Sequence, residues 1–183
     1  MKIISGSLKG RNIDGYDIVG TRPTMARVKE SIFSIIQSKV KKTVVLDLFA
    51  GSGNYSIEAY SNGASFIYAN DANKKCANVI QKNIKNLNIV NNFNIFCMDY
   101  VRCLEYLKEK EIKFDLVFLD PPYEMNICEK IVCFLSKNEM LNNGALIICE
   151  LTNNDMGQVI DNLSLVKTKK YGEKYVLIYK NDI

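Results

Sequence analysis

The most distinctive stretch of the chain is Asp120-Pro121-Pro122-Tyr123, which follows the apolar run Phe114–Leu119. Two successive prolines stiffen the backbone and supply no N–H groups, so the carbonyl of Pro121 has few local donors and can face a pocket. The Asp120 carboxylate and this carbonyl together offer two acceptors at one edge. They match the two N–H bonds of an exocyclic amine on a nucleobase. The stretch therefore predicts a pocket that holds such an amine by both hydrogens.

This grip has a definite chemical use. It reduces the conjugation of the nitrogen lone pair with the ring and aims the lone pair at an electrophilic methyl group, so catalysis would consist mainly of orientation. Tyr123 can stack on an extruded base, a contact worth about 1–3 kcal/mol. The chain has no histidine, which removes the usual base of Ser-His and Cys-His catalysis. The alternative is that Asp120–Tyr123 is only a rigid turn leaving a buried strand.

A second candidate site is the glycine loop, Phe49-Ala50-Gly51-Ser52-Gly53, which follows the apolar run that contains Asp47. Its glycines allow a tight turn and a close approach of the backbone to a ligand at the start of the next helix. A dinucleotide fingerprint would need a third glycine where Ser56 stands, so a pyrophosphate cofactor is disfavoured.

Two further aspartates suit an adenosine-containing ligand. Asp71 stands twenty residues after Gly51, at the end of the second apolar run, where a carboxylate can accept both hydroxyls of a ribose. Asp99 ends the third run and is placed to accept a hydrogen bond from an adenine amino group. The alternative for Asp99 is a cap for the helix that is expected to start near Tyr100.

The elements that must position these residues alternate along the chain from Thr43 onward. Five apolar runs are expected to form strands, at 44–49, 65–69, 93–97, 114–119 and 145–149. Helices are expected between these runs and after the fifth run, near 54–62, 73–87, 100–110, 126–137 and 154–162. Two more strands are expected at the end, at 163–171 and 175–180. Continuous apolar strands that alternate with helices predict a parallel sheet covered on both faces. We expect a Rossmann-like, doubly wound α/β fold with a mostly parallel seven-stranded sheet and a C-terminal antiparallel hairpin.

In open α/β sheets, ligands bind beyond the carboxyl ends of the strands. In this chain those ends carry a series of acidic residues, namely Asp47, Asp71, Asp99, Asp120 and Glu150. Each one alone is better explained as a helix cap. Together they predict a ligand site.

The first 42 residues hold nine basic and three acidic side chains, which gives this region a net charge of +6. Because the whole chain has a net charge of +4, the remaining residues carry a net charge of −2. We expect a short hairpin over Lys2–Ile13, with Arg22-Pro23 as the bend before a helix that Thr24 caps and that runs to about Val40. Basic residues of this region are candidates for contact with RNA phosphates: Lys9, Arg11, Arg27 and Lys29. A solvated helix face is the alternative.

Length and composition set the outer limits. The 183 residues fit one domain, with an extension over 1–42 and a core over 43–183. No apolar run approaches the roughly 18 residues of a membrane span and the start lacks a signal-peptide pattern, so we expect a cytoplasmic protein. Six cysteines without C-x-x-C spacing favour buried, reduced thiols, and no metal site is expected.

The motifs resemble a known family in order along nearly the whole chain. The likeness runs from Ile3-Ile4-Ser5-Gly6 through Arg22-Pro23-Thr24 and Arg27-Val28-Lys29-Glu30 to the glycine loop, Asp120–Tyr123 and Glu150. The chain is similar in this order of motifs to the bacterial small-subunit (16S) ribosomal RNA guanine-N2 methyltransferases. Asn54 after the glycine loop, and tyrosine at the end of the Pro-Pro loop where phenylalanine is also found, are modest departures.

The resemblance implies a class I fold with S-adenosylmethionine (SAM) as methyl donor and S-adenosylhomocysteine (SAH) as product. It implies a guanine of small-subunit rRNA as target, of the type at position 966, and the rRNA or the small subunit as partner of a monomeric enzyme. By the same resemblance, Phe49–Gly53 and Asp71 line the SAM site and Asp120–Tyr123 form the catalytic loop. We hypothesise that Arg22 and Thr24 fold over SAM, the alternative being a helix-capping turn.

Other activities remain open at this point. An Asp-Pro-Pro-Tyr loop would serve an adenine-N6 DNA methyltransferase equally well, although about 42 residues outside the core leave little room for a region that reads a duplex. Methylation of a protein glutamine would leave the basic region without a purpose. The chain could also be a binding module without catalytic turnover, but its intact loop motifs argue against this. A nicotinamide dehydrogenase is a further alternative, and the missing third glycine argues against it.

Overall fold

A computed structural model describes residues 1–15, 23–122, 127–152, 154, 156–157 and 159–183, without the side chains of 23–25. Arg22 and Tyr123, two of the predicted site residues, lie outside this description, as does the side chain of Thr24.

The described residues form an eight-stranded sheet in the order β3-β2-β1-β4-β5-β8-β7-β6. The five strands β1 to β5 are parallel, and β8, β7 and β6 continue the sheet in antiparallel fashion. The strands are β1 Val44–Asp47, β2 Phe66–Asn70, β3 Phe93–Phe96, β4 Phe114–Leu119, β5 Leu141–Leu151, β6 Val159–Ile160, β7 Leu163–Tyr171 and β8 Lys174–Asn181.

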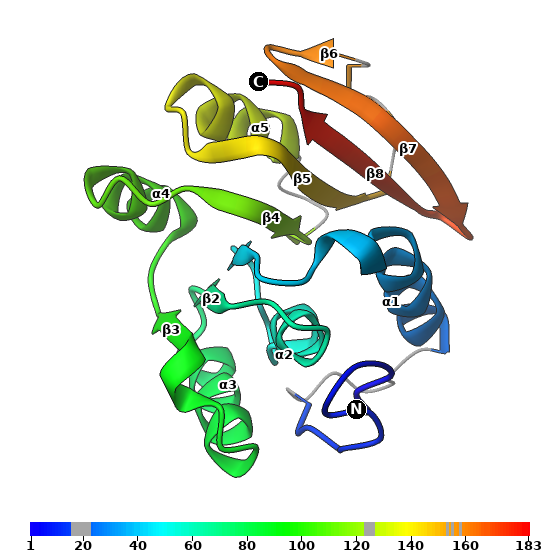
Figure 1. The fold of residues 1–183 in the computed structure, drawn as a ribbon, viewed down its shortest axis with the longest axis vertical. Coiled ribbons are helices and arrows are strands. Elements are labelled where there is room, and N and C mark those ends of the chain that lie inside the picture. Colours follow the sequence, from blue (N-terminus) through cyan, green and yellow to red (C-terminus); the bar gives the residue numbers. More distant parts are fainter. Residues whose placement is uncertain (16–22, 123–126, 153, 155, 158) are drawn as a thin grey trace.

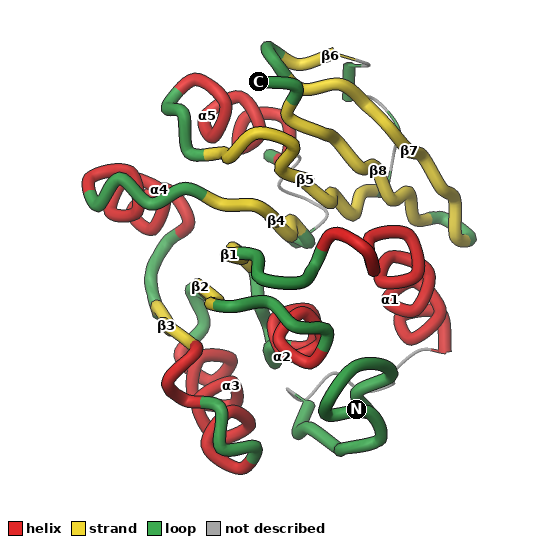
Figure 2. The backbone as a smooth tube through the Cα atoms, in the orientation of Figure 1, coloured by secondary structure: helices red, strands yellow, loops and turns green. Residues whose placement is uncertain are grey.

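Helices cover both faces of this sheet (Figure 1). The α-helices are α1 Pro23–Ile36, α2 Asn54–Ser61, α3 Lys74–Asn86, α4 Tyr100–Glu109 and α5 Cys128–Lys137, and short 3-10 turns span Gln37–Lys39 and Val90–Asn92. Helices α1, α2 and α3 lie on one side of the sheet, and α4 and α5 lie on the other (Figure 2).

The apolar strands explain this layering. Because successive side chains of a strand point to opposite faces, Val45 packs with Ile57 of α2 and Ile80 of α3, whereas its neighbour Leu46 packs with Leu104 of α4. Each face thus has its own core. The expected parallel α/β sheet with its C-terminal hairpin is confirmed.

Three sequence-based expectations need correction. The helix expected near 154–162 is wrong, because the described part of this segment contains the short strand β6, which pairs with β7 and raises the number of strands from seven to eight. Helix α1 begins at Pro23, so Thr24 lies in its first turn and not before it. Four of the six free cysteines are buried, but Cys97 is exposed and Cys133 is half-buried.

The first fifteen residues double back as expected, although they form only a single antiparallel bridge between Lys2 and Asn12. Their backbone groups pair across the turn, with Ile3 N–H donating to Arg11 O and Gly10 N–H donating to Ile3 O. We call residues 1–15 the N-terminal loop. It lies beside α2, with the chain end close to α1 (Figure 1).

Within the ranges described, the structure has no helix that combines the length and apolar character needed to cross a lipid bilayer.

Candidate active site

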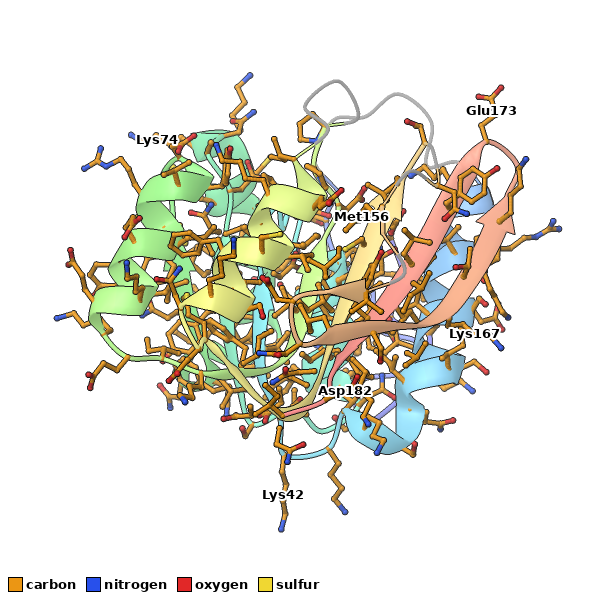
Figure 3. All side chains as sticks on the ribbon, turned by 90° about the horizontal axis from the view of Figure 1, so that it is seen from above. Lys42, Lys74, Met156, Lys167, Glu173 and Asp182 are labelled. Carbon is orange, nitrogen blue, oxygen red and sulfur yellow. The ribbon has the colours of Figure 1, made fainter. Side chains whose placement is uncertain are left out.

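The parallel strands bring their acidic carboxyl ends to one end of the sheet. Lys74, which starts α3 after β2, and Glu173, in the turn between β7 and β8, lie at this end, and Lys42 projects at the opposite end (Figure 3). Asp120 follows the last residue of β4 directly, between the ends of β1 and β5. It is half-buried, Pro121 behind it is buried, and Pro122 is exposed.

The carboxylate of Asp120 accepts no hydrogen bond from the residues that the structure describes. Its surroundings nevertheless disfavour the charged form, because burial, and after it the nearby Glu150 carboxylate, raise the pKa of Asp120 from 3.8 to about 8. Lys174 acts in the opposite direction and lowers this pKa. A partly buried carboxylate with unused acceptor capacity is what the predicted amine pocket requires.

Glu150, near the end of β5, is held by two partners. It is only 4% exposed; the Tyr55 hydroxyl donates to its Oε1, and Lys174 Nζ lies 3.3 Å from its Oε2. Tyr55 is held in turn by stacking on Phe118, with ring centroids 5.1 Å apart and planes at 9°. Strand β5, helix α2 and the C-terminal hairpin therefore fix one carboxylate beside Asp120.

The sequence pattern points to these partners incompletely. Glu150 was predicted only as one of the acids at the strand ends, and Tyr55, which follows the glycine loop closely, was not predicted to serve the site. Lys174 was not predicted to belong to the site. Its contact with Glu150 depends on the antiparallel pairing of β8 with β5, which places Val176 opposite Glu150 and which no local pattern reveals.

The glycine loop is tied to the ends of β2 and β1. Ala50 N–H donates to Asn70 O at 2.8 Å and Gly51 N–H donates to Asp71 Oδ2 at 2.9 Å, and Asp71 Oδ1 accepts from Asn73 N–H at 2.8 Å. Gly51 and Gly53 both have positive φ, of 56° and 80°. Glycine adopts this conformation without the strain that other residues suffer.

Asp47 supports the loop from below. This carboxylate is 2% exposed, and its Oδ2 accepts from the backbone N–H and the hydroxyl of Ser56 at 3.1 and 2.6 Å, which fixes the first turn of α2 to the end of β1. Burial raises the pKa of Asp47 to about 7, against the opposing hydrogen bonds from Ser56. Asp47 is therefore placed to hold the loop more than to face a ligand.

The loop fits the adenosyl group that was predicted for it. A Cβ on Gly51 would meet no described atom within 4 Å, so open space lies in front of that residue, whereas a Cβ on Gly53 would lie 3.3 Å from Ile80. Each oxygen of the half-buried Asp71 already accepts one hydrogen bond and retains capacity for a ribose hydroxyl. Phe49, half-buried, packs on Tyr100 with centroids 5.8 Å apart.

Asp99 uses one oxygen as a helix cap. Its Oδ1 accepts from Val101 N–H at 2.9 Å at the start of α4, and the residue is exposed. The capping alternative is thus realised. Because the other oxygen remains accessible, capping does not prevent a contact with an adenine amino group.

The basic candidates of the N-terminal region separate into two groups. Lys9, Arg11 and Arg27 are exposed and available to a polyanion. Lys29 is 2% exposed, and its Nζ lies 2.8 Å from Glu58 Oε2 in the interior. The expectation that Lys29 contacts RNA is therefore wrong, because its charge is already neutralised by a buried carboxylate.

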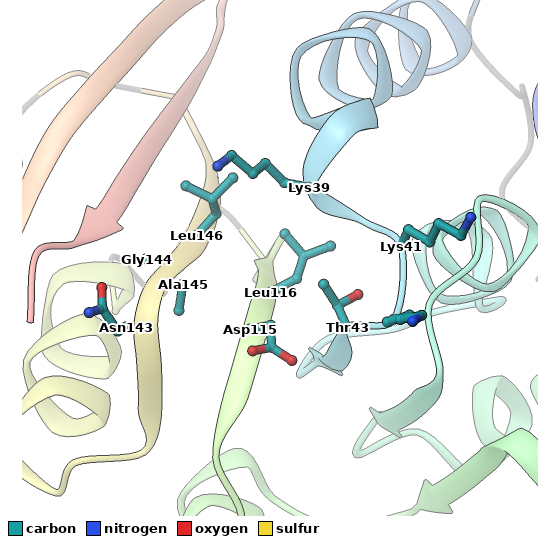
Figure 4. A pocket seen from close by; sticks show the side chains of 10 residues that line it. Lys39, Lys41, Thr43, Asp115, Leu116, Asn143, Gly144, Ala145 and Leu146 are labelled. Atoms are coloured by element: carbon teal, nitrogen blue, oxygen red, sulfur yellow. The ribbon is translucent and has the colours of Figure 1, made fainter.

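A separate cavity of about 270 Å³ lies at the amino ends of β1, β4 and β5, away from the strand-end acids (Figure 4). Lys39 and Lys41 line it, but their side chains point away from one another. Asp115, also in its lining, already accepts hydrogen bonds from Val44 N–H and Asn142 Nδ2. This cavity offers no convergent group for the predicted chemistry.

A family model described as "Conserved hypothetical protein 95" matches residues 1–180 of the chain. The chain belongs to this family. A relative from Bacillus subtilis named "Putative rRNA methyltransferase YlbH" is 33% identical over 98% of both chains. The "Ribosomal RNA small subunit methyltransferase D" of Buchnera aphidicola (subsp. Acyrthosiphon pisum) is 35% identical, over 91% of this chain and 86% of that protein.

The fold is also found among solved structures. One described as "Putative methyltransferase yhhF from Escherichia coli" superimposes with a TM-score of 0.86 at 27% identity, over 100% of this chain and 98% of that one. The predicted family resemblance and the methyltransferase fold are confirmed.

Proposed function

We propose that this protein is a SAM-dependent rRNA methyltransferase that transfers a methyl group to the exocyclic N2 amine of a guanine in small-subunit rRNA, with SAH as the other product. The proposal treats residues 1–183 as one methyltransferase domain whose basic region, 1–42, contacts the RNA. The observation that carries it is the Asp120 carboxylate, unengaged by described residues and placed at the strand ends beside the glycine loop.

In this proposal SAM supplies the electrophilic methyl group when bound. The glycine loop Phe49–Gly53 and Asp71 hold its adenosyl part, Asp47 fixes the loop through Ser56, and Asp99 accepts from the adenine amine. Arg22 and Thr24 remain candidates for covering the cofactor.

The residues after β4 act on the nucleobase. Asp120 and the Pro121 carbonyl accept the two hydrogens of the amine and orient its lone pair, Pro122 stiffens the loop, and Tyr123 stacks on the base. Because the methyl group passes from the sulfur of SAM to the amine nitrogen and leaves SAH, the amine must lose one proton, and the Asp120 carboxylate is the acceptor already hydrogen-bonded to it. The raised pKa of Asp120 suits this task near neutral pH.

Support for the RNA substrate comes from the names of the relatives and from the exposed cations Lys9, Arg11 and Arg27. Support for guanine N2, and for the guanine at position 966 of the rRNA, comes from the motif resemblance. The same two acceptors would also serve an adenine amine in DNA, so the substrate must be tested directly.

The deciding experiment offers labelled SAM to the protein with protein-free rRNA, small subunits, duplex DNA and a mixed protein extract. Label in rRNA or in small subunits, recovered as N2-methylguanine after digestion, is the expected result. N6-methyladenine in DNA, labelled glutamine, or SAH binding without transfer to any substrate would each overturn the proposal. Mapping the methyl group that is missing in a deletion strain then tests position 966.

The RNA-binding part has its own test with a matched control. We expect the double variant Arg11→Glu with Arg27→Glu to bind rRNA more weakly and to lower the salt slope of log K by roughly 1.5, because each lost phosphate contact contributes about 0.7–0.9. Lys110→Glu with Lys113→Glu makes the same change of charge at two exposed lysines outside residues 1–42, just before the amino end of β4, and should leave the slope unchanged. Equal slopes for the two double variants would contradict the assignment.

A further inference from the structure

Two buried polar side chains of the core hold the N-terminal loop in place. Glu58 on α2 is 0% exposed and Asn83 on α3 is 2% exposed. Both form hydrogen bonds with backbone groups of residues 1–15, which lie more than fifty positions away in the sequence. Nothing in the reaction described above uses either side chain.

Glu58 forms hydrogen bonds with the N-terminal loop and none with the described residues of the glycine loop. Its carboxylate accepts from the N–H of Ile4 and from the N–H and hydroxyl of Ser5, at distances between 2.7 and 3.2 Å. Lys29 of α1 closes this network, with its Nζ 2.8 Å from Glu58 Oε2 and 3.0 Å from Lys2 O. The network fixes the first turn of the N-terminal loop to α1 and α2.

Asn83 differs because it serves two segments at once. Its Oδ1 accepts from Asp14 N–H at 2.8 Å, and its Nδ2 donates to Asp14 O at 3.0 Å and to Ser52 O at 3.2 Å. Ser52 belongs to the glycine loop and lies between the two glycines with positive φ. One planar amide thus joins the glycine loop to the end of the N-terminal loop.

The two segments have different tasks in the proposed reaction. Ser52 belongs to the loop assigned to the adenosyl group, whereas Asp14 lies in the basic region, between the exposed Arg11 and the helix that carries Arg27. An amide has a rigid plane and few rotatable bonds, so Ser52 O cannot shift without straining the contacts with Asp14 or breaking one of them. A displacement at one site is therefore felt at the other.

We propose that Asn83 is a positioning residue that couples binding of the methyl donor to the placement of the RNA-facing N-terminal region. This inference rests on the proposed function, since it takes the glycine loop as the adenosyl site and the basic region as the RNA site. Coupling between two sites is reciprocal, so RNA must tighten SAH binding by the same factor by which SAH tightens RNA binding.

The test uses hydrogen–deuterium exchange at the Asp14 amide, whose N–H donates to Asn83, with and without saturating SAH. We expect SAH to slow this exchange several-fold in the wild-type protein. In Asn83→Leu, which has a similar size but no hydrogen-bonding groups, SAH should leave exchange at residue 14 unchanged and should itself bind several-fold more weakly. Thermal melting of the variant confirms that it is folded.

Lys82→Ala is the matched control. Lys82 neighbours Asn83 in the sequence and also binds Asp14, with Nζ 2.6 Å from Oδ2, but it does so at the surface, with 65% of its side chain exposed. No hydrogen bond or ion pair joins Lys82 to the described residues of the glycine loop. We expect the full SAH response in this variant.

Two results would overturn the proposal. One is an exchange rate at the Asp14 amide that SAH does not change in the wild-type protein. This result does not depend on the folding of any variant. The other is an equal SAH response in the wild type and in Asn83→Leu. Neither depends on methyl transfer, so failure of the rRNA assay and failure of the coupling are separate findings.

Discussion

Asp115 and Asp120 lie near the two ends of the same strand, β4, and both are half-buried, yet their carboxylates are used in opposite ways. Asp115, at the amino end, accepts from Val44 N–H at 2.7 Å and from Asn142 Nδ2 at 2.8 Å. Asp120, at the carboxyl end, accepts nothing from the described residues and faces a second carboxylate, Glu150. A carboxylate whose oxygens are both engaged stabilises the fold, whereas one kept free and near a like charge is available for a ligand.

The largest effect that we expect is a loss of activity when Asp120, but not Asp115, is substituted. Asp120→Asn should lower kcat on the order of 100- to 1000-fold, because the amide keeps an acceptor oxygen but cannot take the proton of the amine or carry the negative charge of the carboxylate. The Kd for SAH should stay within about twofold, since Asp120 is not assigned to the cofactor. Single-turnover kinetics and calorimetric SAH titration measure the two quantities. A variant with normal kcat would remove Asp120 from the mechanism.

The same variant carries an internal control for stability. Because the pKa of Asp120 is raised from 3.8 to about 8, the folded protein binds this proton more tightly than the unfolded chain does. The stabilisation is complete below about pH 4 and is lost as the pH rises through about 8. Asn escapes this loss, so the Tm of Asp120→Asn relative to wild type should increase between pH 4 and pH 9.

Asp115→Ala tests the opposite end of the strand. Its removal leaves Val44 N–H and the Asn142 amide without their acceptor, which costs about 1–3 kcal/mol and lowers Tm by roughly 2–4 °C per kcal/mol. We expect kcat of the folded variant to remain that of the wild type. Thermal melts and kinetics at a temperature well below Tm check both statements; a catalytic defect in fully folded protein would contradict the division of roles.

Asp99 stands between these extremes, with one oxygen engaged in a helix cap. Asp99→Ser keeps a capping oxygen, so stability should change by only a few tenths of a kcal/mol. If the free oxygen binds the adenine amine, the Kd for SAH should rise by roughly fivefold, as expected for a lost hydrogen bond of about 1 kcal/mol. Unchanged SAH affinity would leave Asp99 with its capping role alone.

The smallest effect sharpens the role of the cation beside Asp120. Lys174 lowers the pKa of Asp120, so Lys174→Met should move the rise of kcat/KM with pH towards higher pH without changing the plateau much. Lys170→Met is the control, because Lys170 lies on the same hairpin but its Nζ faces the ring of Tyr175 at 5.1 Å. Identical pH profiles for the two variants would show that Lys174 does not tune the site.

Much of the parallel core could be predicted from the sequence, because its strands are largely apolar runs and helices α3, α4 and α5 each have a regular apolar face. The same rules fail at 154–162. A strand of two residues, Val159–Ile160, is too short to show a period, and its pairing with β7 is a tertiary contact. The grouping of the strand-end acids was also predictable, because a parallel topology brings the carboxyl ends of the strands to the same edge of the sheet.

Lys29 shows where residue type misleads. Lysine is usually exposed, but position 29 shares a helix face with Phe33 and Ile36, both buried, at spacings of four and seven residues. This spacing was a visible signal that the side chain points inward. Its partner Glu58 could not be identified, because the pairing of α1 with α2 depends on how both helices pack on the sheet.

The anchoring of the N-terminal loop has a consequence for biosynthesis. Residues 1–15 leave the ribosome before Glu58 and Asn83, which accept their backbone N–H groups and are synthesised more than forty residues later. A Cβ on Gly6 would lie 1.8 Å from Ser61 O, so the loop fits against the finished end of α2 and not against an extended chain. Residues 1–15 must therefore wait, undocked, for two helices that have yet to emerge.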